Sequence, residues 1–164
     1  MVTSIKGNDT STFGGNVDVP QIITDAPVFS AIKGSTQALS SATVTKLNYD
    51  TEQFDTNNLY DVSTSRFTPN VEGYYQINAQ FSGASPSYEE FIIYIYKNGA
   101  SLIGGAQFGG GNTTPNYSNK PNASALVYLN GSTDYLEIYG YVSQAQTLIS
   151  SSFSFFQGHL VRAV

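Results

Sequence analysis

Few side chains of this sequence stand at spacings that suit catalysis. The only histidine, His159, lies in the run FFQGHLV beside Phe156 and Leu160. A hydrolase would need a nucleophile and an acid around it, and this run contains no nucleophile-elbow motif. We therefore interpret His159 as a structural residue on a strand face or at an axis between copies. The sequence indicates a protein that is not an enzyme.

Two groups of acidic residues are candidates for a metal site or for acid–base chemistry. Asp50, Glu52 and Asp55 cluster in NYDTEQFDTNN, but their spacing is not that of a calcium loop and the glycine of such a loop is missing. A solvated turn is the first interpretation, and a bound cation is the alternative. Glu89 and Glu90 are adjacent, so in a regular strand they point to opposite faces and cannot act as paired acids on a sugar. The sequence predicts no cofactor and no metal ion.

Glycine and tyrosine give two further candidates for ligand binding. The run GGAQFGGGN, residues 104–112, is followed by neither Gly-Lys-Ser/Thr nor a helix, so it is not a phosphate cradle. Tyr88 and Tyr117 lie in or near expected loops. A tyrosine offers a flat apolar face with a polar tip, which suits a sugar. These two residues support an alternative function, the recognition of a host-surface glycan or protein.

Composition narrows the choice of partners. The 164 residues include twelve acids and seven bases, a net charge of -5, and no cysteine. Nucleic acid is disfavoured because phosphate contacts need clustered Lys and Arg. A membrane span is disfavoured because no apolar run approaches about 20 residues. Charged residues make up 12% of the chain, against about 25% in a typical soluble domain, and such a surface suits protein contact.

The elements that must position these residues are strands. No 3.6-residue period holds for the length of a helix, and short β-rich runs recur between Gly, Asn, Ser and Pro clusters. In RFTPNVEGYYQINAQF, residues 66–81, Tyr75, Ile77, Ala79 and Phe81 alternate toward one face, which we expect to be the core. The opposite face carries Tyr74, Gln76, Asn78 and Gln80.

Other runs complete an antiparallel sandwich of about eight to ten strands. Strands are expected over residues 26–35, 43–54 and 58–67, and a last strand closes the chain. Hairpins are expected at Asn98-Gly99 and at Asn130-Gly131, because Asn-Gly favours the positive φ angles of a tight turn. Phe67, Ile93 and Ile138 are expected in the core with Tyr75 and Phe81.

Two strands are apolar on both faces, in FIIYIY and in YLEIYGYV. One sandwich core buries only one face of each sheet, and a soluble monomer rarely exposes a large apolar patch. We therefore expect the second face to be covered by further copies of the chain. The predicted contact between copies comprises Tyr74, Tyr94, Tyr96, Tyr139, Tyr141 and His159.

A family resemblance agrees with this interpretation. Tyr49, Asp55, Tyr60, Phe67, Gly73 and Tyr75 stand at the intervals of the signature of the complement and collagen-associated globular heads, which are tumour-necrosis-factor-like jelly rolls. Tyr49 replaces the usual Phe, and Ile77 and Ala79 replace later aromatics. PVFSA and FFQGHLV resemble that family's first and last strands. The resemblance covers roughly residues 27–164. It implies a ten-strand-type antiparallel jelly roll and a homotrimer with threefold symmetry.

Residues 1–26 differ from the rest and are interpreted as an arm that precedes the jelly-roll domain of residues 27–164. The leader IKGNDTSTFGGNVDV resembles leaders of structural proteins in tailed bacteriophages. The sequence therefore predicts a trimeric virion protein, most simply a capsid decoration or cement protein, because the chain is short and begins with Met. The alternative is a receptor-binding head at a fibre tip. The predicted capsid anchors are Phe13, Val17, Val19, Ile22 and Ile23.

Overall fold

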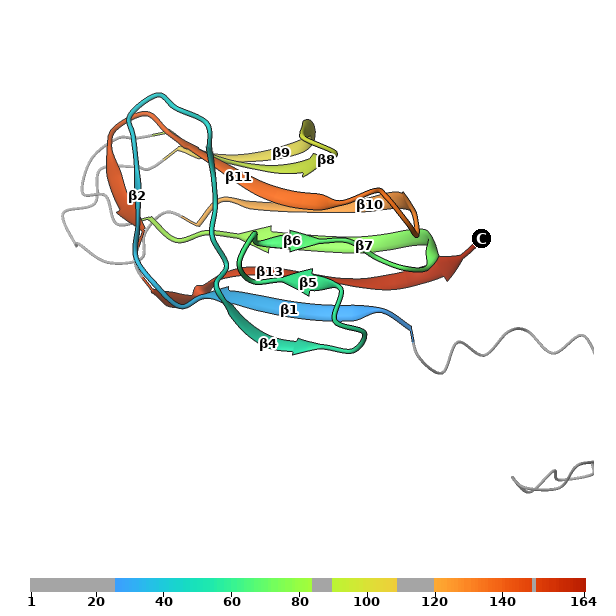
Figure 1. The fold of residues 1–164 in the computed structure, drawn as a ribbon. Helices are drawn as coiled ribbons and strands as arrows, with labels where there is room; N and C mark the ends of the chain where they lie inside the picture. Colours follow the sequence, from blue (N-terminus) through green and yellow to red (C-terminus); the bar gives the residue numbers. More distant parts are fainter. Residues whose placement is uncertain (1–25, 84–89, 109–119, 149) are drawn as a thin grey trace, which may run out of the picture.

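The computed structural model describes residues 26–83, 90–108, 120–148 and 150–164. This part of the chain contains strands and no helix, and two antiparallel sheets lie face to face around one core (Figure 1). The strands are β1 (Val28–Lys33), β2 (Gln37–Leu39), β3 (Thr45–Lys46), β4 (Thr51–Asp55), β5 (Tyr60–Asp61), β6 (Arg66–Phe67), β7 (Glu72–Gln80), β8 (Glu90–Lys97), β9 (Ala100–Phe108), β10 (Asn122–Asn130), β11 (Leu136–Val142), β12 (Gln146–Leu148) and β13 (Ser151–Ala163).

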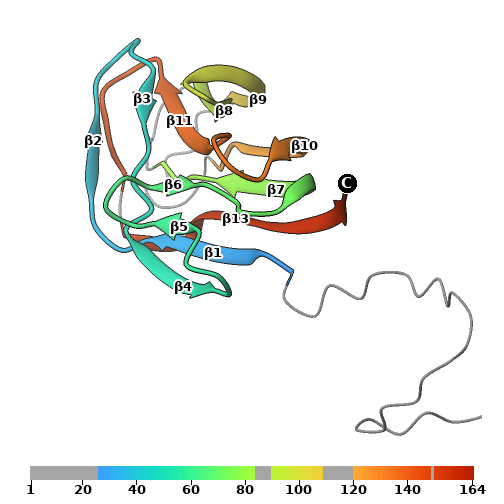
Figure 2. The ribbon, with the colours of Figure 1, turned by 45° about the vertical axis from the view of Figure 1, so that its right-hand side comes forward.

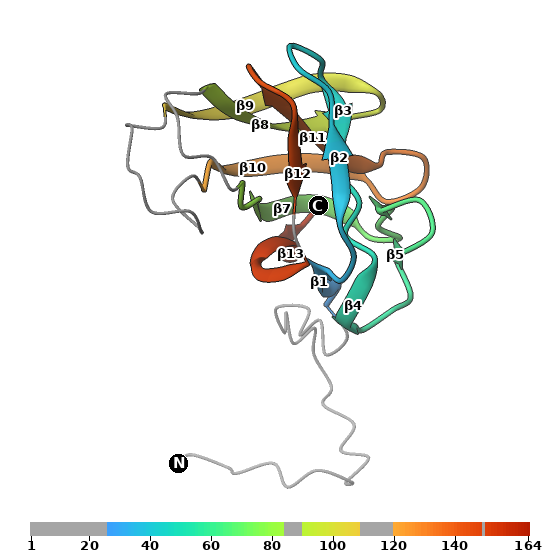
Figure 3. The same ribbon diagram turned by 90° about the vertical axis from the view of Figure 1, so that its left-hand side faces the viewer.

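The strand order is that of a sandwich with many long-range connections. The five-stranded sheet has the order β10-β7-β13-β1-β4, and the six-stranded sheet has the order β5-β6-β11-β8-β9 with β3 also paired to β11. Figure 2 shows the two layers from an oblique angle. A third, two-stranded sheet of β2 and β12 crosses one end of the sandwich (Figure 3). The first strand, β1, pairs with the last strand, β13.

Strand β7 has the two faces that its sequence predicts. Tyr75, Ile77, Ala79 and Phe81 are at most 1% exposed, whereas Tyr74 is 42% exposed. Ile93 of β8 and Ile138 of β11 are buried opposite them, as expected. The alternation is sharp because one face of β7 packs on the core, so a slip of one residue would turn every apolar side chain outward.

The residues of the family signature meet in this core. Phe29 of β1 stacks on Tyr60 and Phe67 at ring-centroid distances of 5.2 and 4.2 Å, and Phe67 meets Tyr75 edge-on at 5.7 Å. The hydroxyls of the buried tyrosines have hydrogen-bond partners. The Tyr60 hydroxyl, for example, donates to the Tyr49 carbonyl at 2.7 Å. Gly73 is needed because a Cβ there would lie 2.3 Å from the Arg162 carbonyl oxygen.

The two Asn-Gly turns behave differently. Asn98 and Gly99 have φ of 53° and 81° and join β8 to its neighbour β9, so the first predicted hairpin is confirmed. The predicted hairpin at Asn130-Gly131 is wrong. Strand β10 pairs with β7 and β11 pairs with β8, so this connection crosses from one sheet to the other. Gly131 still needs its positive φ of 66°, but pairing partners far along the chain decide where each strand goes.

The single strand expected over residues 43–54 is two separate strands in the structure. Its first part is β3, in the six-stranded sheet, and its last part is β4, at the edge of the five-stranded sheet. Between them Tyr49 is buried, and its backbone N–H donates to the Ser65 hydroxyl at 2.9 Å. The chain changes sheets at this buried tyrosine, which a reading of strand propensity does not reveal. Residues 58–67 likewise form two short strands, β5 and β6.

Candidate functional site

His159 lies in the open on the outward side of β13. It is a cross-strand neighbour of Val28 and Gln76, beside a hollow of about 200 Å³ that Phe54, Asn78 and Gln157 also line. None of the described residues lining this hollow is a carboxylate or a nucleophile. This position on a strand face is compatible with a structural role for His159. That role stays a prediction.

Two of the three acidic residues of the 50–55 region, Asp50 and Asp55, serve as caps for turns. The Asp50 carboxylate accepts hydrogen bonds from the backbone N–H groups of Gly34 and Ser35 at 2.6 and 3.2 Å, and from the Ser35 hydroxyl. The Asp55 carboxylate accepts from the N–H of Tyr60 at 2.7 Å. Among the residues that the structure describes, no three His, Cys, Asp or Glu side chains converge to hold a metal ion. Turn capping therefore accounts for the carboxylates of Asp50 and Asp55, and Glu52 is exposed on β4.

The outward side of the six-stranded sheet carries a cluster of tyrosines, which we term the tyrosine face. Tyr96 stacks on Tyr139 with ring centroids 4.0 Å apart, and Tyr94 meets Tyr96 edge-on at 6.2 Å. These side chains are half-buried, and burial raises the pKa of the Tyr94 and Tyr139 hydroxyls. The members of the tyrosine face are Tyr94, Tyr96, Tyr135, Tyr139 and Tyr141.

A buried carboxylate lies within the tyrosine face. Glu137 of β11 accepts hydrogen bonds at one oxygen, Oε1, from Lys46 Nζ at 2.6 Å and from Arg66 Nε and Nη2 at 3.0 and 2.8 Å. Burial alone would raise the pKa of Glu137, but the hydrogen bonds from both cations outweigh it and the pKa lies below its usual value. The Arg66 guanidinium also lies over the Tyr135 ring, 3.8 Å from the centroid.

The outward side of the five-stranded sheet, which we term the open face, is more apolar than a solvated surface requires. Large hydrophobic side chains stand exposed on four of its strands. They are Phe54 (51% exposed), Tyr74 (42%), Leu126 (61%), Tyr128 (39%), Phe153 (46%) and Val161 (55%). Polar side chains cross the middle of this sheet, where Gln76 donates to the Ser124 hydroxyl at 2.9 Å and that hydroxyl donates to Asn78 at 2.8 Å.

A groove of about 520 Å³ lies at the edge of the sandwich where β9 and β10 meet. Leu102 and Ile103 of β9 and Leu126 and Tyr128 of β10 are among the residues that line it. These two strands are the edges of different sheets, so each has one side of its backbone unpaired within the described residues. The groove continues the apolar surface of the open face around the edge.

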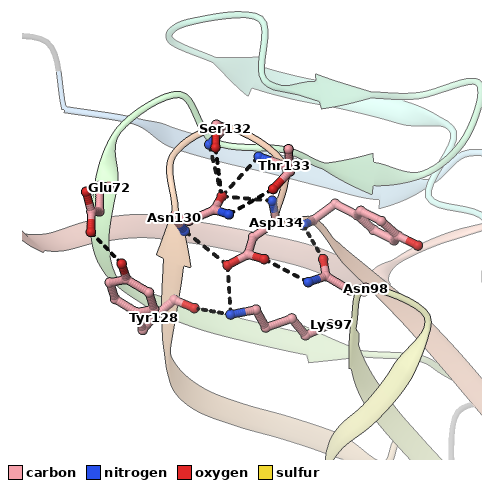
Figure 4. A network of polar contacts seen from close by, with 9 residues as sticks. Glu72, Lys97, Asn98, Tyr128, Asn130, Ser132, Thr133 and Asp134 are labelled. Carbon is pink, nitrogen blue, oxygen red and sulfur yellow. Dashed lines mark hydrogen bonds and ion pairs between the residues drawn. The ribbon is translucent and has the colours of Figure 1, made fainter.

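A polar network fixes one end of this edge (Figure 4). Lys97 pairs with Asp134 at 2.8 Å and donates to the Tyr128 carbonyl at 2.8 Å. Asn98 donates to the other Asp134 oxygen at 2.7 Å, which ties the β8–β9 turn to the crossover between β10 and β11. Hydrogen bonds from Lys97 and Asn98 lower the pKa of Asp134. The network therefore positions the edge strands relative to each other.

The residues predicted to contact other copies do not gather on one surface. Tyr74 and His159 lie on the open face, whereas Tyr94, Tyr96, Tyr139 and Tyr141 lie on the tyrosine face, on the opposite side of the sandwich. The five predicted anchors of the arm lie outside the described residues, as do Tyr88 and Tyr117.

Sequence reasoning missed two features of these surfaces. The grouping of Lys46, Arg66 and Glu137 gave no signal beyond one acid among the tyrosines of YLEIYGYV. The exposed Leu126 and Val161 had a local signal, because SALVYLN and GHLVRAV are apolar at successive positions.

Comparisons with known proteins bear on the fold. No family model and no curated protein matches the chain. Solved structures do match. The globular domain of zebrafish complement 1qA aligns with a TM-score of 0.61 at 15% identity, covering 85% of this chain and 99% of that one. Eiger TNF from S. frugiperda aligns with 0.57 at 14%, covering 85% and 93%. Murine APRIL aligns with 0.60 at 11%, covering 83% and 99%.

These likenesses concern the fold. Together with the antiparallel sandwich they confirm that the chain is an all-β jelly roll of the complement-head and tumour-necrosis-factor type. Among the described residues there is no helix of the length and apolarity that would cross a membrane.

Proposed function

We propose that the protein is a non-enzymatic, homotrimeric structural protein of a bacteriophage virion, a capsid decoration or cement protein attached through residues 1–26. The observation that carries the homotrimer in this proposal is the apolar open face. Six exposed hydrophobic side chains on one sheet favour contact with another protein surface. The likeness of the leader to those of phage structural proteins directs the proposal to a virion.

A threefold ring suits the placement of these residues. In a cyclic trimer each copy offers two different surfaces, one to each neighbour. The open face and the β9–β10 edge are two such surfaces, and Leu102 and Leu126 give the edge an apolar rim. We therefore assign the contact between copies to these two surfaces. In this assignment Tyr74 and His159 belong to the contact between copies, and the residues of the tyrosine face do not.

The domain has two ends, which suits attachment at one of them. The chain enters the sandwich at the start of β1, and this point and the C-terminus lie at the same end (Figure 1). The Pro27 carbonyl accepts a hydrogen bond from the Leu160 N–H at 2.9 Å, so the start of the domain is held against β13. The β2–β12 pair lies at the opposite end. An arm that joins the domain at Ala26 would place that opposite end away from the capsid.

The second candidate function is a receptor-binding head at a fibre tip, with Tyr88 and Tyr117 as sugar contacts. Imaging of intact particles separates the two, with particles lacking the protein as the control. Threefold density on the capsid surface supports the decoration protein, and density only at fibre tips supports the receptor-binding head. If neither place loses density when the protein is absent, the virion role is wrong.

A further inference from the structure

We propose that the tyrosine face binds a carboxylate-bearing sugar, with Arg66 and Lys46 holding the carboxylate. This site differs from the arm and from Tyr88 and Tyr117, and it does not depend on a capsid location. It requires only that the tyrosine face stay outside the contact between copies.

Among the residues that the structure describes, the ion pairs on this face give two cations a single carboxylate, which leaves one positive charge unbalanced. Lys46 and Arg66 share the single carboxylate of Glu137, and all three of their hydrogen bonds end on the same oxygen. The Glu137 side chain is only 4% exposed, whereas those of Lys46 and Arg66 are 28% and 39% exposed. The cations therefore reach solvent and the anion lies behind them. A second carboxylate arriving from solvent would balance the charge.

One further acid neighbours this group, and it has partners of its own. Asp61 is the cross-strand neighbour of Arg66, but its carboxylate accepts hydrogen bonds from the Ser63 and Thr64 hydroxyls at 2.7 and 2.8 Å. These bonds hold it in the turn after β5. Since the whole chain carries a net charge of -5, a surface where two cations meet one buried carboxylate is the exception, and it would attract an anion.

The aromatic side chains favour a sugar over a bare anion. Arg66 lies over the Tyr135 ring, 3.8 Å from the centroid, so the ring helps to hold the guanidinium in place. Neither hydrogen bond to Glu137 uses Nη1, which leaves a fixed donor for an incoming carboxylate. Tyr139, the cross-strand neighbour of Lys46 and Tyr94, is stacked on Tyr96. Tyrosine rings give a pyranose an apolar surface and hydroxyls to bind.

Saturation-transfer NMR on the full chain tests the proposal with defined sugars. The probes are methyl β-glucuronide, the methyl glycoside of N-acetylneuraminic acid, neutral methyl β-glucoside and sodium acetate. We expect transfer to at least one acidic sugar and not to the neutral one, and we expect acetate to compete only weakly. The proposal is wrong if no acidic sugar binds, or if the neutral sugar binds equally well. Competition by acetate as strong as that by the acidic sugar would indicate an ordinary anion site only.

Two variants locate the site. Arg66→Gln should weaken binding of the acidic sugar by about tenfold or more, because the charged fork is lost. Arg162→Gln, which removes an exposed cation on the other sheet, should leave binding unchanged. If Arg66→Gln fails to fold, Tyr96→Leu takes its place. This variant keeps every charge and removes one ring, and it should weaken binding of the acidic sugar. Full binding by the folded Arg66→Gln protein, or by Tyr96→Leu in its place, would refute the assignment.

Discussion

Phe29 and Phe67 stack face to face with ring centroids 4.2 Å apart, although they come from strands of different sheets. Both are at most 1% exposed. Phe156 meets Phe29 edge-on at 4.9 Å from the last strand. Together these rings connect the first strand, the last strand and the six-stranded sheet in the core of the sandwich.

Replacing Phe67 by alanine should destabilise the domain by about 3–5 kcal/mol, because a buried ring is lost and its stacking partner faces a cavity. Chemical denaturation at one fixed protomer concentration measures the change, since an oligomer's stability depends on concentration. Val62→Ala, at a side chain that is 40% exposed, is the control and should change stability by less than about 0.5 kcal/mol. Equal effects of the two variants would contradict the assignment of the core.

Leu126→Glu should prevent assembly, because an unpaired carboxylate buried between copies costs several kcal/mol. Light scattering at micromolar concentration should show the wild type at three times 17.7 kDa and the variant at a single chain mass. Tyr94→Glu is the matched variant on the tyrosine face and should leave the trimer intact. If Tyr94→Glu dissociates the protein and Leu126→Glu does not, the contact lies on the tyrosine face, where the sequence had placed four of the six predicted contact residues. A wild-type monomer would refute the trimer itself.

Glu137 should make the fold less stable in acid. Its pKa is depressed in the folded protein, so its stabilising contribution is complete above the unfolded value of about 4.3. The contribution is lost as the pH falls through the lower folded value. Melting temperature should therefore fall with pH below about 4, and Glu137→Gln should show a shallower fall. Glu52→Gln, at an exposed position, should follow the wild-type curve. A Glu137→Gln curve as steep as that of the wild type would show that other acids carry the effect.

The sequence predicted the fold where local pattern and long-range pairing agree. Alternation in β7 and the Asn98-Gly99 turn are of this kind, since β8 and β9 are neighbours in both sequence and space. Asn130-Gly131 carries the same local signal, but β10 finds its partner some fifty residues earlier in the chain, in β7. The grouping of Lys46, Arg66 and Glu137 could not be predicted for the same reason, because three separate strands bring it together.

The arm provides the last prediction, and it separates the two virion roles. Phe13, Val17, Val19, Ile22 and Ile23 are apolar residues that the core of the sandwich does not need, because Phe29, Tyr60, Phe67 and their neighbours already fill it. Deleting residues 1–23 should leave the trimer folded, since the described domain begins at Ala26, and should abolish binding to the capsid. The truncated protein is added to particles that lack the protein, and both are pelleted together. A full-length variant with serine at the five apolar positions is the matched control for chain length, and it should fail to co-sediment in the same way. If the truncated trimer pellets as well as the wild type, the arm is not the anchor, and the receptor-binding head becomes the better proposal.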